Sequence, residues 1–270
     1  MIADIAHSLA GWRLSEVEHR YGPNVHILDD PYYSTLLAHL CSAECVQPRF
    51  NQIVKRLYSG LARTVLNNEF PRKRRRAPTR MSATTERGVV DSDFLDPSTP
   101  VVTVDLARAG ILPSMTVFEV LNETLNPQSV RQDHLIMQRK TNADGHVVGA
   151  ELFGSKVGGP VDDRIILFPD PMGATGSSMC NAIGYYNSNG RPGPIITMHL
   201  IITPEYIRRV LAEHPDTKIY ALRLDRGLSR PEVLACVPGE RWDDEVGLNA
   251  HQYIVPGGGG FGELMNNALV

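Results

Sequence analysis

Short apolar runs alternate with amphipathic stretches through the second half of the chain. The apolar runs occupy residues 101–107, 133–138, 164–168, 194–202 and 218–224, and helical patterns occupy 115–125, 179–186 and 205–213. This alternation is typical of a parallel sheet with helices on both faces. The segments RIILF and ITMHLII, at 164–168 and 196–202, are predominantly apolar, which predicts strands buried on both sides. We therefore expect an α/β fold built on a mainly parallel sheet flanked by helices.

The first hundred residues follow a different pattern. Apolar positions between Ile5 and Leu14 predict a short amphipathic helix over residues 4–18, and NVHILDDP at 24–31 predicts a strand that ends in a turn. Two amphipathic helices are expected over residues 32–66, separated by Pro48. Residues 70–88 are basic, contain two prolines and have little apolar content, so they predict an exposed arm or loop.

Composition narrows the class of partner. The 270 residues are 42% hydrophobic and 21% charged, which is typical of one globular domain with extensions. The formal net charge is -3, so neither nucleic acid nor a membrane surface is expected as the main partner. The four cysteines form no CxxC pair, so neither a zinc site nor a disulfide framework is expected. Free cysteines fit a protein of the reducing cytoplasm. No apolar run reaches the ~18 residues of a membrane span, and we expect neither a signal peptide nor an anchor.

The segment RIILFPDPMGATGSSMCNAIGYY, residues 164–186, carries the candidate chemistry. A buried strand runs into Asp170, then a loop of small residues, then a helix, and ligands of open parallel sheets bind at such strand ends. The loop comprises Pro171, Met172, Gly173, Ala174, Thr175, Gly176, Ser177 and Ser178. Its N–H groups can converge on a phosphate at the positive end of the helix, while the Asp170 carboxylate accepts hydrogen bonds from ribose hydroxyls. The segment predicts a sugar-phosphate site.

A purely structural turn is the alternative for this loop. In that interpretation Gly173 and Gly176 supply positive φ, and Ser177 or Ser178 is an N-cap. The loop is not a Walker loop, because it has no GK[ST] sequence, and it does not match the dinucleotide-binding pattern GxGxxG.

DPMGATGSS at residues 170–178 resembles the DPMLATGGS phosphoribosyl pyrophosphate loop of uracil phosphoribosyltransferases. Four more segments are similar to that family in the same order: NVHILDDP to NVHxLxHP, VDLARAGILPSM to ILRAGLGM, LIMQRKT to MYRxEET, and QYIVPGGGGFGE to YIVPGLGDxGD. The resemblance implies a phosphoribosyltransferase-like fold that transfers phosphoribose from phosphoribosyl pyrophosphate to uracil, giving UMP and pyrophosphate. It also implies a homodimer, and a Mg²⁺ cofactor bound through substrate oxygens and water.

Residue by residue, the resemblance implies two parts of one site. The phosphoribosyl pyrophosphate part comprises Arg108, Arg139, Asp170, the loop 171–178 and Gly260, and the uracil part comprises Tyr253, Ile254, Gly259, Gly260 and Phe261. Guanidinium groups suit pyrophosphate because they bind its oxygens with charge-assisted hydrogen bonds. Arg108 and Arg139, together with Asp170 at the ribose, are therefore the candidate catalytic residues. From the residues alone, a structural ion pair with a nearby Asp or Glu is favoured for Arg108, and Arg139 could be a solvated surface cation.

The chain departs from the family pattern at several positions. Gly260 stands where the family has an acid, and the next acid is Glu263 in place of Asp. Main-chain groups of the GGGG stretch can still bind a uracil edge, although such a stretch can also be a flexible turn. Within the phosphate loop, Gly173 replaces a leucine and Ser177 a glycine, changes that such a loop can absorb.

Residues 226–243 are interpreted as an inserted lobe. Its Trp242 or Arg241 could cap the site, or the lobe could pack on the surface or at a subunit interface. We divide one domain, 1–270, into N-terminal helices and arm (1–100), a core sheet with the phosphate loop (101–225), and the lobe with a base-binding hood (226–270). This C-terminal hood begins at QYIVPGGGGFGE.

Two other functions remain open. One is a non-catalytic, nucleotide-responsive regulator whose basic run from Arg72 to Arg76 binds RNA or another acidic partner, although that run lacks the interleaved aromatic residues of a single-strand binding surface. The other is a phosphoribosyltransferase for a different base.

Overall fold

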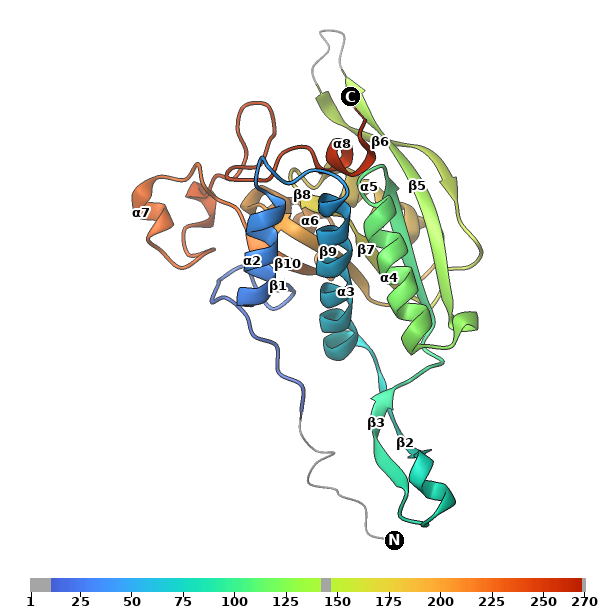
Figure 1. Ribbon diagram of the computed structural model, residues 1–270. Coiled ribbons are helices and arrows are strands. Elements are labelled where there is room, and N and C mark those ends of the chain that lie inside the picture. The colour runs from blue at the N-terminus through green and yellow to red at the C-terminus, as the bar shows by residue number, and fades with distance from the viewer. Residues whose placement is uncertain (1–10, 142–146, 269–270) are drawn as a thin grey trace.

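The computed structural model describes residues 11–141 and 147–268, and their side chains except those of 138–150. The strands of the central sheet are β1 (Val25–Ile27), β4 (Val101–Ala107), β5 (Val130–Thr141), β6 (Val147–Lys156), β7 (Ile165–Pro169), β8 (Met172–Gly173), β9 (Ile195–Ile202) and β10 (Lys218–Leu224). They lie in the order β1-β10-β9-β7-β4-β5-β6, with the short β8 beside β9 (Figure 1). All neighbours run parallel except β5 and β6, so the predicted α/β fold class is confirmed.

Helices cover both faces of this sheet. Helices α2 (Pro31–Leu40), α3 (Arg49–Glu69) and α4 (Ile111–Thr124) lie on one face, and α5 (Ser177–Ser188) and α6 (Pro204–Glu213) lie on the other (Figure 1). Because successive strand residues point to opposite faces, β7 contributes to both cores. Leu167 packs in the core under α3 and α4, whereas Phe168 packs edge-on against Tyr186 of α5 with ring centroids 5.6 Å apart.

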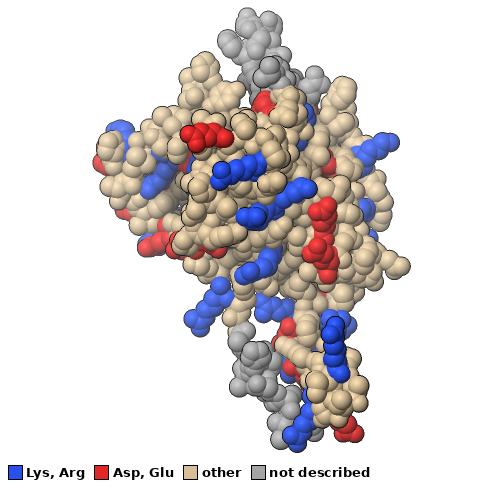
Figure 2. Space-filling view, in the orientation of Figure 1, with Lys and Arg blue, Asp and Glu red and all other residues tan. Residues whose placement is uncertain are grey.

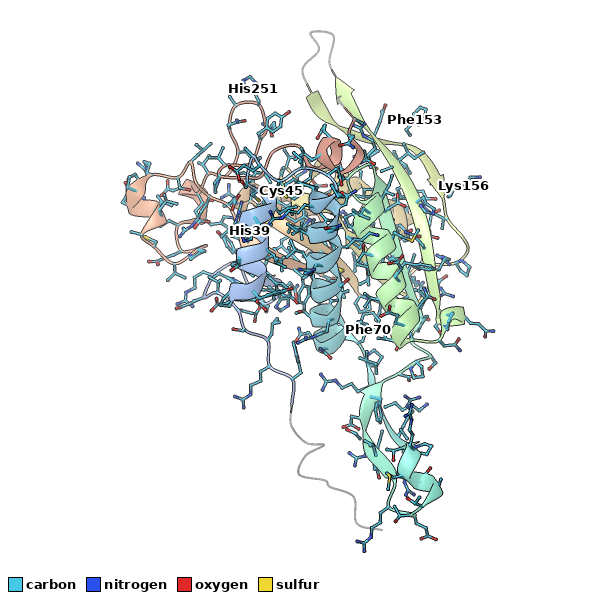
Figure 3. All side chains as sticks on the ribbon, in the orientation of Figure 1. His39, Cys45, Phe70, Phe153, Lys156 and His251 are labelled. Atoms are coloured by element: carbon cyan, nitrogen blue, oxygen red, sulfur yellow. The ribbon has the colours of Figure 1, made fainter. Side chains whose placement is uncertain are left out.

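The basic arm is an antiparallel hairpin of β2 (Arg72–Pro78) and β3 (Val89–Leu95) that projects away from the body (Figure 1). It leaves the body just after Phe70, where α3 ends (Figure 3). This is the exposed arm of the sequence interpretation, and its two strands were not predicted. Basic and acidic side chains share the hairpin (Figure 2): Arg74 Nε donates to Asp91 at 2.7 Å, and the Arg75 guanidinium lies over the Phe94 ring. The acidic second strand therefore offsets part of the positive charge.

Four local predictions need correction. Residues 4–10 of the predicted N-terminal helix lie outside the described residues, and 11–18 contain no helix, because Glu16 pairs with Leu28 as an extended segment. Helix α4 begins at Ile111, four residues earlier than the apolar spacing indicates. Strand β6 was not predicted. The C-terminal hood ends in a short helix, α8 (Phe261–Asn266), where only strand, turn and loop were expected. No helix in the described parts of the chain is long and apolar enough to cross a membrane.

Candidate active site

A pocket of about 610 Å³ opens at the carboxyl end of the sheet. Four segments that are far apart in sequence line it: the end of β4, Ile136 and Met137 of β5, the loop after β7, and the C-terminal hood. Of the residues predicted from the sequence, the lining includes Arg108, Asp170, Met172, Ala174, Ser178, Tyr253, Ile254, Gly259, Gly260 and Phe261. Pro171, Gly173, Thr175, Gly176 and Ser177 belong to the same loop but are outside this lining. Arg139 lies on β5, and its side chain is not among those described.

Arg108 follows β4 on a tight turn. The Gly110 N–H donates to the Leu106 carbonyl at 3.0 Å, and a Cβ at Gly110 would lie 2.6 Å from the Leu106 nitrogen. A residue without a side chain is therefore needed for this turn. The Arg108 side chain is exposed and lines the pocket, and no ion pair with another described residue is recorded for it. Within the part of the chain that the structure describes, the structural ion pair considered as the alternative for Arg108 is not formed.

The phosphate loop ends on Gly176, which has φ of +77° and is the N-cap residue of α5. Gly176 thus supplies the left-handed conformation, whereas Gly173 does not, and neither Ser177 nor Ser178 is an N-cap. No hydrogen bond to another described residue is recorded for the N–H groups of Thr175 and Gly176. The first N–H groups of α5 also have no partner within the helix. Together these donors and the positive helix end can bind an anion.

Asp170 lies half-buried between this loop and the pocket. Burial raises the pKa of its carboxyl from an ordinary value of 3.8 to about 7. No hydrogen bond from another described residue to this carboxylate is recorded, so nothing in the described protein offsets its loss of hydration. A ligand that brings hydrogen-bond donors or a cation would stabilise the charged form.

A buried polar network holds the loop from behind. His199 Nδ1 donates to the Asp170 carbonyl at 2.6 Å, and Tyr206 Oη donates to His199 Nε2 at 2.7 Å. Burial lowers the pKa of His199 to about 3, so the ring is neutral and has one donor and one acceptor. Thr203 Oγ1 donates to the Ala174 carbonyl at 2.7 Å and accepts from the Tyr206 N–H. The sequence analysis did not identify these residues, whose signal is a polar side chain inside or directly after an apolar run.

Two charged residues at the end of β10 hold the start of the glycine stretch. Arg223 pairs with buried Asp225 through Nε at 2.6 Å and Nη2 at 2.8 Å. Gly257 donates its N–H to Asp225 at 2.7 Å, and its carbonyl accepts from Arg223 at 2.8 Å. Gly257 has φ of +62°, which a side chain would disfavour. The sequence analysis did not identify this pair, although the sequence Arg-Leu-Asp at the end of an apolar run could have indicated it.

The rest of the hood is anchored by its aromatic side chain. Phe261 is fully buried and packs edge-on against Phe50 of α3, with ring centroids 5.2 Å apart. Its main chain is therefore the part available to a ligand. A Cβ at Gly262 would lie 3.6 Å from the Ala109 Cβ, which places the hood beside the Arg108 turn. At the other end, His251 lies at the exposed tip of the preceding loop (Figure 3).

The inserted lobe packs away from the pocket. Trp242 donates to the Pro204 carbonyl at 3.1 Å and packs edge-on against Tyr21, and Arg241 pairs with Asp244 at 2.7 Å. Neither Trp242 nor Arg241 lines the pocket, so the structure gives no support to the capping role considered for them.

One group of possible metal ligands lies outside the pocket lining. Cys180, Glu213 and His214 bring ligand atoms within 4.8 Å of one another. Arg209 donates to Glu213 at 2.9 Å, and burial raises the pKa of the Cys180 thiol to about 12. A bound cation would have to displace the guanidinium and a thiol proton, so we assign no metal to this group.

Comparison with known proteins finds relatives over most of the chain. Residues 27–239 match the model of the family described as uracil phosphoribosyltransferase. The chain is 27% identical over 250 residues to a uracil phosphoribosyltransferase of Burkholderia thailandensis, covering 90% of this chain and 94% of that protein. It is 35% identical over 104 residues to one of Pyrobaculum islandicum, covering 38% of this chain and 48% of that relative.

Among solved structures, the AQ2163 protein from Aquifex aeolicus superposes with a TM-score of 0.69 at 17% identity, over 91% of this chain and 99% of that one. This likeness concerns the fold alone. The family model covers most of the chain, including the Arg108 turn, the phosphate loop and β10. The chain therefore belongs to the uracil phosphoribosyltransferase family.

Proposed function

We propose that the protein transfers phosphoribose from phosphoribosyl pyrophosphate to uracil, giving UMP and pyrophosphate. The observation that carries this proposal is one pocket that joins an arginine, a half-buried carboxylate and a phosphate-type loop to a hood of main-chain groups, with no ion pair to another described residue at either charged group. The first three suit a sugar carrying phosphate and pyrophosphate. The hood suits a flat polar base, because exposed N–H and C=O groups can pair with its edge.

Each part has a distinct role in the proposed reaction. Loop donors around Thr175 and Gly176 bind the 5-phosphate, and Asp170 accepts hydrogen bonds from the ribose hydroxyls. Arg108 stabilises the charge that develops on pyrophosphate as its bond to the anomeric carbon breaks. The base nitrogen forms the new bond to that carbon and gives up its proton to water, so the protein mainly holds both reactants in line and needs no nucleophile of its own.

Magnesium is part of this proposal. Asp170 fits it, because this carboxylate faces the pocket, has a raised pKa and has no recorded cation partner among the described residues. Mg²⁺ would be held through substrate oxygens and water beside Asp170, since this ion seldom uses a cage made only of protein ligands. When bound it supplies positive charge to the leaving group. The homodimer implied by the resemblance stays a prediction, which sedimentation of the purified protein would check.

The test is product analysis with a panel of bases. The protein is incubated with phosphoribosyl pyrophosphate, Mg²⁺ and each of uracil, cytosine, adenine, guanine and hypoxanthine, and nucleotide and pyrophosphate are quantified together. UMP formed in equal amount with pyrophosphate supports the proposal. Transfer to another base alone would keep the transferase and reject uracil. Nucleotide binding without transfer to any base would favour the regulator.

A further inference from the structure

The space beside Gly260 is already occupied by a carboxylate. Gly260 has φ of -82° and ψ of 91°, which any residue can adopt, so the backbone does not require glycine here. A Cβ at this position, however, would lie 2.2 Å from Glu263 Oε2 and 2.9 Å from Glu263 Cδ. The carboxylate of Glu263 thus fills the place where a side chain at position 260 would begin.

Glu263 reaches that place because of its position in α8. Gly260 is the N-cap residue and Glu263 is the third residue of the helix, so its side chain can turn back over the N-cap. The helix itself is fixed: Phe261 is buried, and Asn51 and Gln47 donate to the Met265 carbonyl at 3.1 and 3.2 Å. The direction of the Glu263 side chain is therefore set by anchored backbone.

The Glu263 carboxylate is available to a ligand. It is half-buried and lines the same pocket as Arg108 and Asp170. No ion pair or side-chain hydrogen bond with another described residue is recorded for it, including the bond to the Gly260 N–H that a capping box would form. A Cβ at the adjacent Gly262 would lie 3.6 Å from the Ala109 Cβ, so the backbone beside Glu263 passes close to the Arg108 turn.

We propose that Glu263 is a binding residue for magnesium phosphoribosyl pyrophosphate and supplies the side-chain acid that position 260 lacks. This inference rests on the proposed function. An ionised carboxylate only accepts hydrogen bonds, and the donors that this substrate offers are ribose hydroxyls and magnesium-bound water. Glu263 therefore selects the sugar-pyrophosphate, while the main chain of the hood binds the base.

The test moves the acid between the two positions. The variants are E263A, E263Q and the double variant G260D/E263A, with E119A as the control, because Glu119 is an exposed glutamate of α4 outside the pocket lining. We expect E263A to raise the KM for phosphoribosyl pyrophosphate about tenfold, the scale of one charged hydrogen bond, and to leave the KM for uracil within about twofold. G260D/E263A should recover most of the lost affinity, and E119A should match the wild type.

E263Q separates binding from helix capping. Glutamine serves a capping box as well as glutamate does, so a purely structural role predicts wild-type kinetics for E263Q. A binding role predicts a raised KM for phosphoribosyl pyrophosphate that depends on Mg²⁺ concentration, at unchanged unfolding midpoint. An unchanged KM in both E263A and E263Q would overturn the inference.

Failure of the proposed function gives a different result. If the wild type transfers phosphoribose to no base, calorimetry with magnesium phosphoribosyl pyrophosphate still tests Glu263: weaker binding by E263A supports the inference, and equal binding rejects it. A wild type that neither transfers nor binds rejects both.

Discussion

Replacing Asp170 with asparagine should stabilise the protein while it abolishes most activity. The charged form of Asp170 is penalised by burial, and its carboxylate has no recorded partner among the described residues. Asparagine keeps the size and removes the charge. Turnover should fall sharply, because the charged acceptor for the ribose hydroxyls is lost, and phosphoribosyl transfer measured beside the wild type checks this.

The gain in free energy of unfolding that we expect for Asp170→Asn, and its dependence on pH, follow from the raised pKa of Asp170. Between the ordinary value of 3.8 and about 7, folded Asp170 holds a proton that the unfolded chain releases, so the free energy of unfolding falls as pH rises. At about 1.4 kcal/mol for each tenfold change in acidity, this cost reaches at most about 4 kcal/mol above pH 7. Water in the pocket lessens it, and we expect a gain of about 2 kcal/mol for Asp170→Asn at pH 8 that disappears near pH 4.

Urea unfolding at pH 8, 6 and 4 measures the effect, with Asp133→Asn as the matched control. Asp133 is fully buried but accepts from Arg131 at 2.9 and 3.0 Å, Tyr186 at 2.8 Å and Gly158 at 2.9 Å. Removing its charge leaves Arg131 without its partner and should cost about 3 kcal/mol. The same substitution thus has opposite signs at the two sites. A loss of stability in Asp170→Asn at pH 8, or a gain that does not shrink toward pH 4, would refute the reasoning.

Three further predictions concern other parts of the site. Arg108→Ala and Arg139→Ala should each weaken kcat/KM for phosphoribosyl pyrophosphate by ~1.5 to 3 kcal/mol; if neither changes it, the pyrophosphate site lies elsewhere. Tyr206→Phe leaves buried His199 Nε2 without a donor, so urea unfolding should show a loss of about 1 to 3 kcal/mol and the KM for phosphoribosyl pyrophosphate should rise; no change in either would exclude a supporting role for the network. Trp242→Ala should lower the free energy of unfolding by about 2 kcal/mol with kinetics unchanged, and a raised KM would return the lobe to the active site.

The sequence predicts the sheet better than its surroundings because the strand signal is local. Continuous apolar runs identify β7 and β9, and small residues after β7 identify the loop. Other elements depend on contacts that are remote in sequence. Residues around Glu16 extend because they pair with Leu28, and α8 forms in a glycine-rich tail because Phe261 is buried against Phe50. His199 and Thr203 likewise acquire their roles only when the loop folds over them.

At two glycines that depart from the family pattern, another side chain of this protein occupies the space that a side chain would need. A Cβ at Gly173 would lie 2.9 Å from Ile202 Cγ2 and 3.0 Å from the Tyr206 ring, so the space of the absent side chain belongs to the residues that support the loop. At Gly260 that space belongs to the Glu263 carboxylate. A single restoring substitution at either glycine therefore meets an occupied site: Gly173→Leu collides with a packed ring, and Gly260→Asp places two carboxylates together. The Glu263 side chain can move away from position 260 at a lower cost than the buried Tyr206 ring can move away from position 173. We therefore expect one compensating substitution, at Glu263, to restore the activity of Gly260→Asp, whereas no single substitution should restore that of Gly173→Leu.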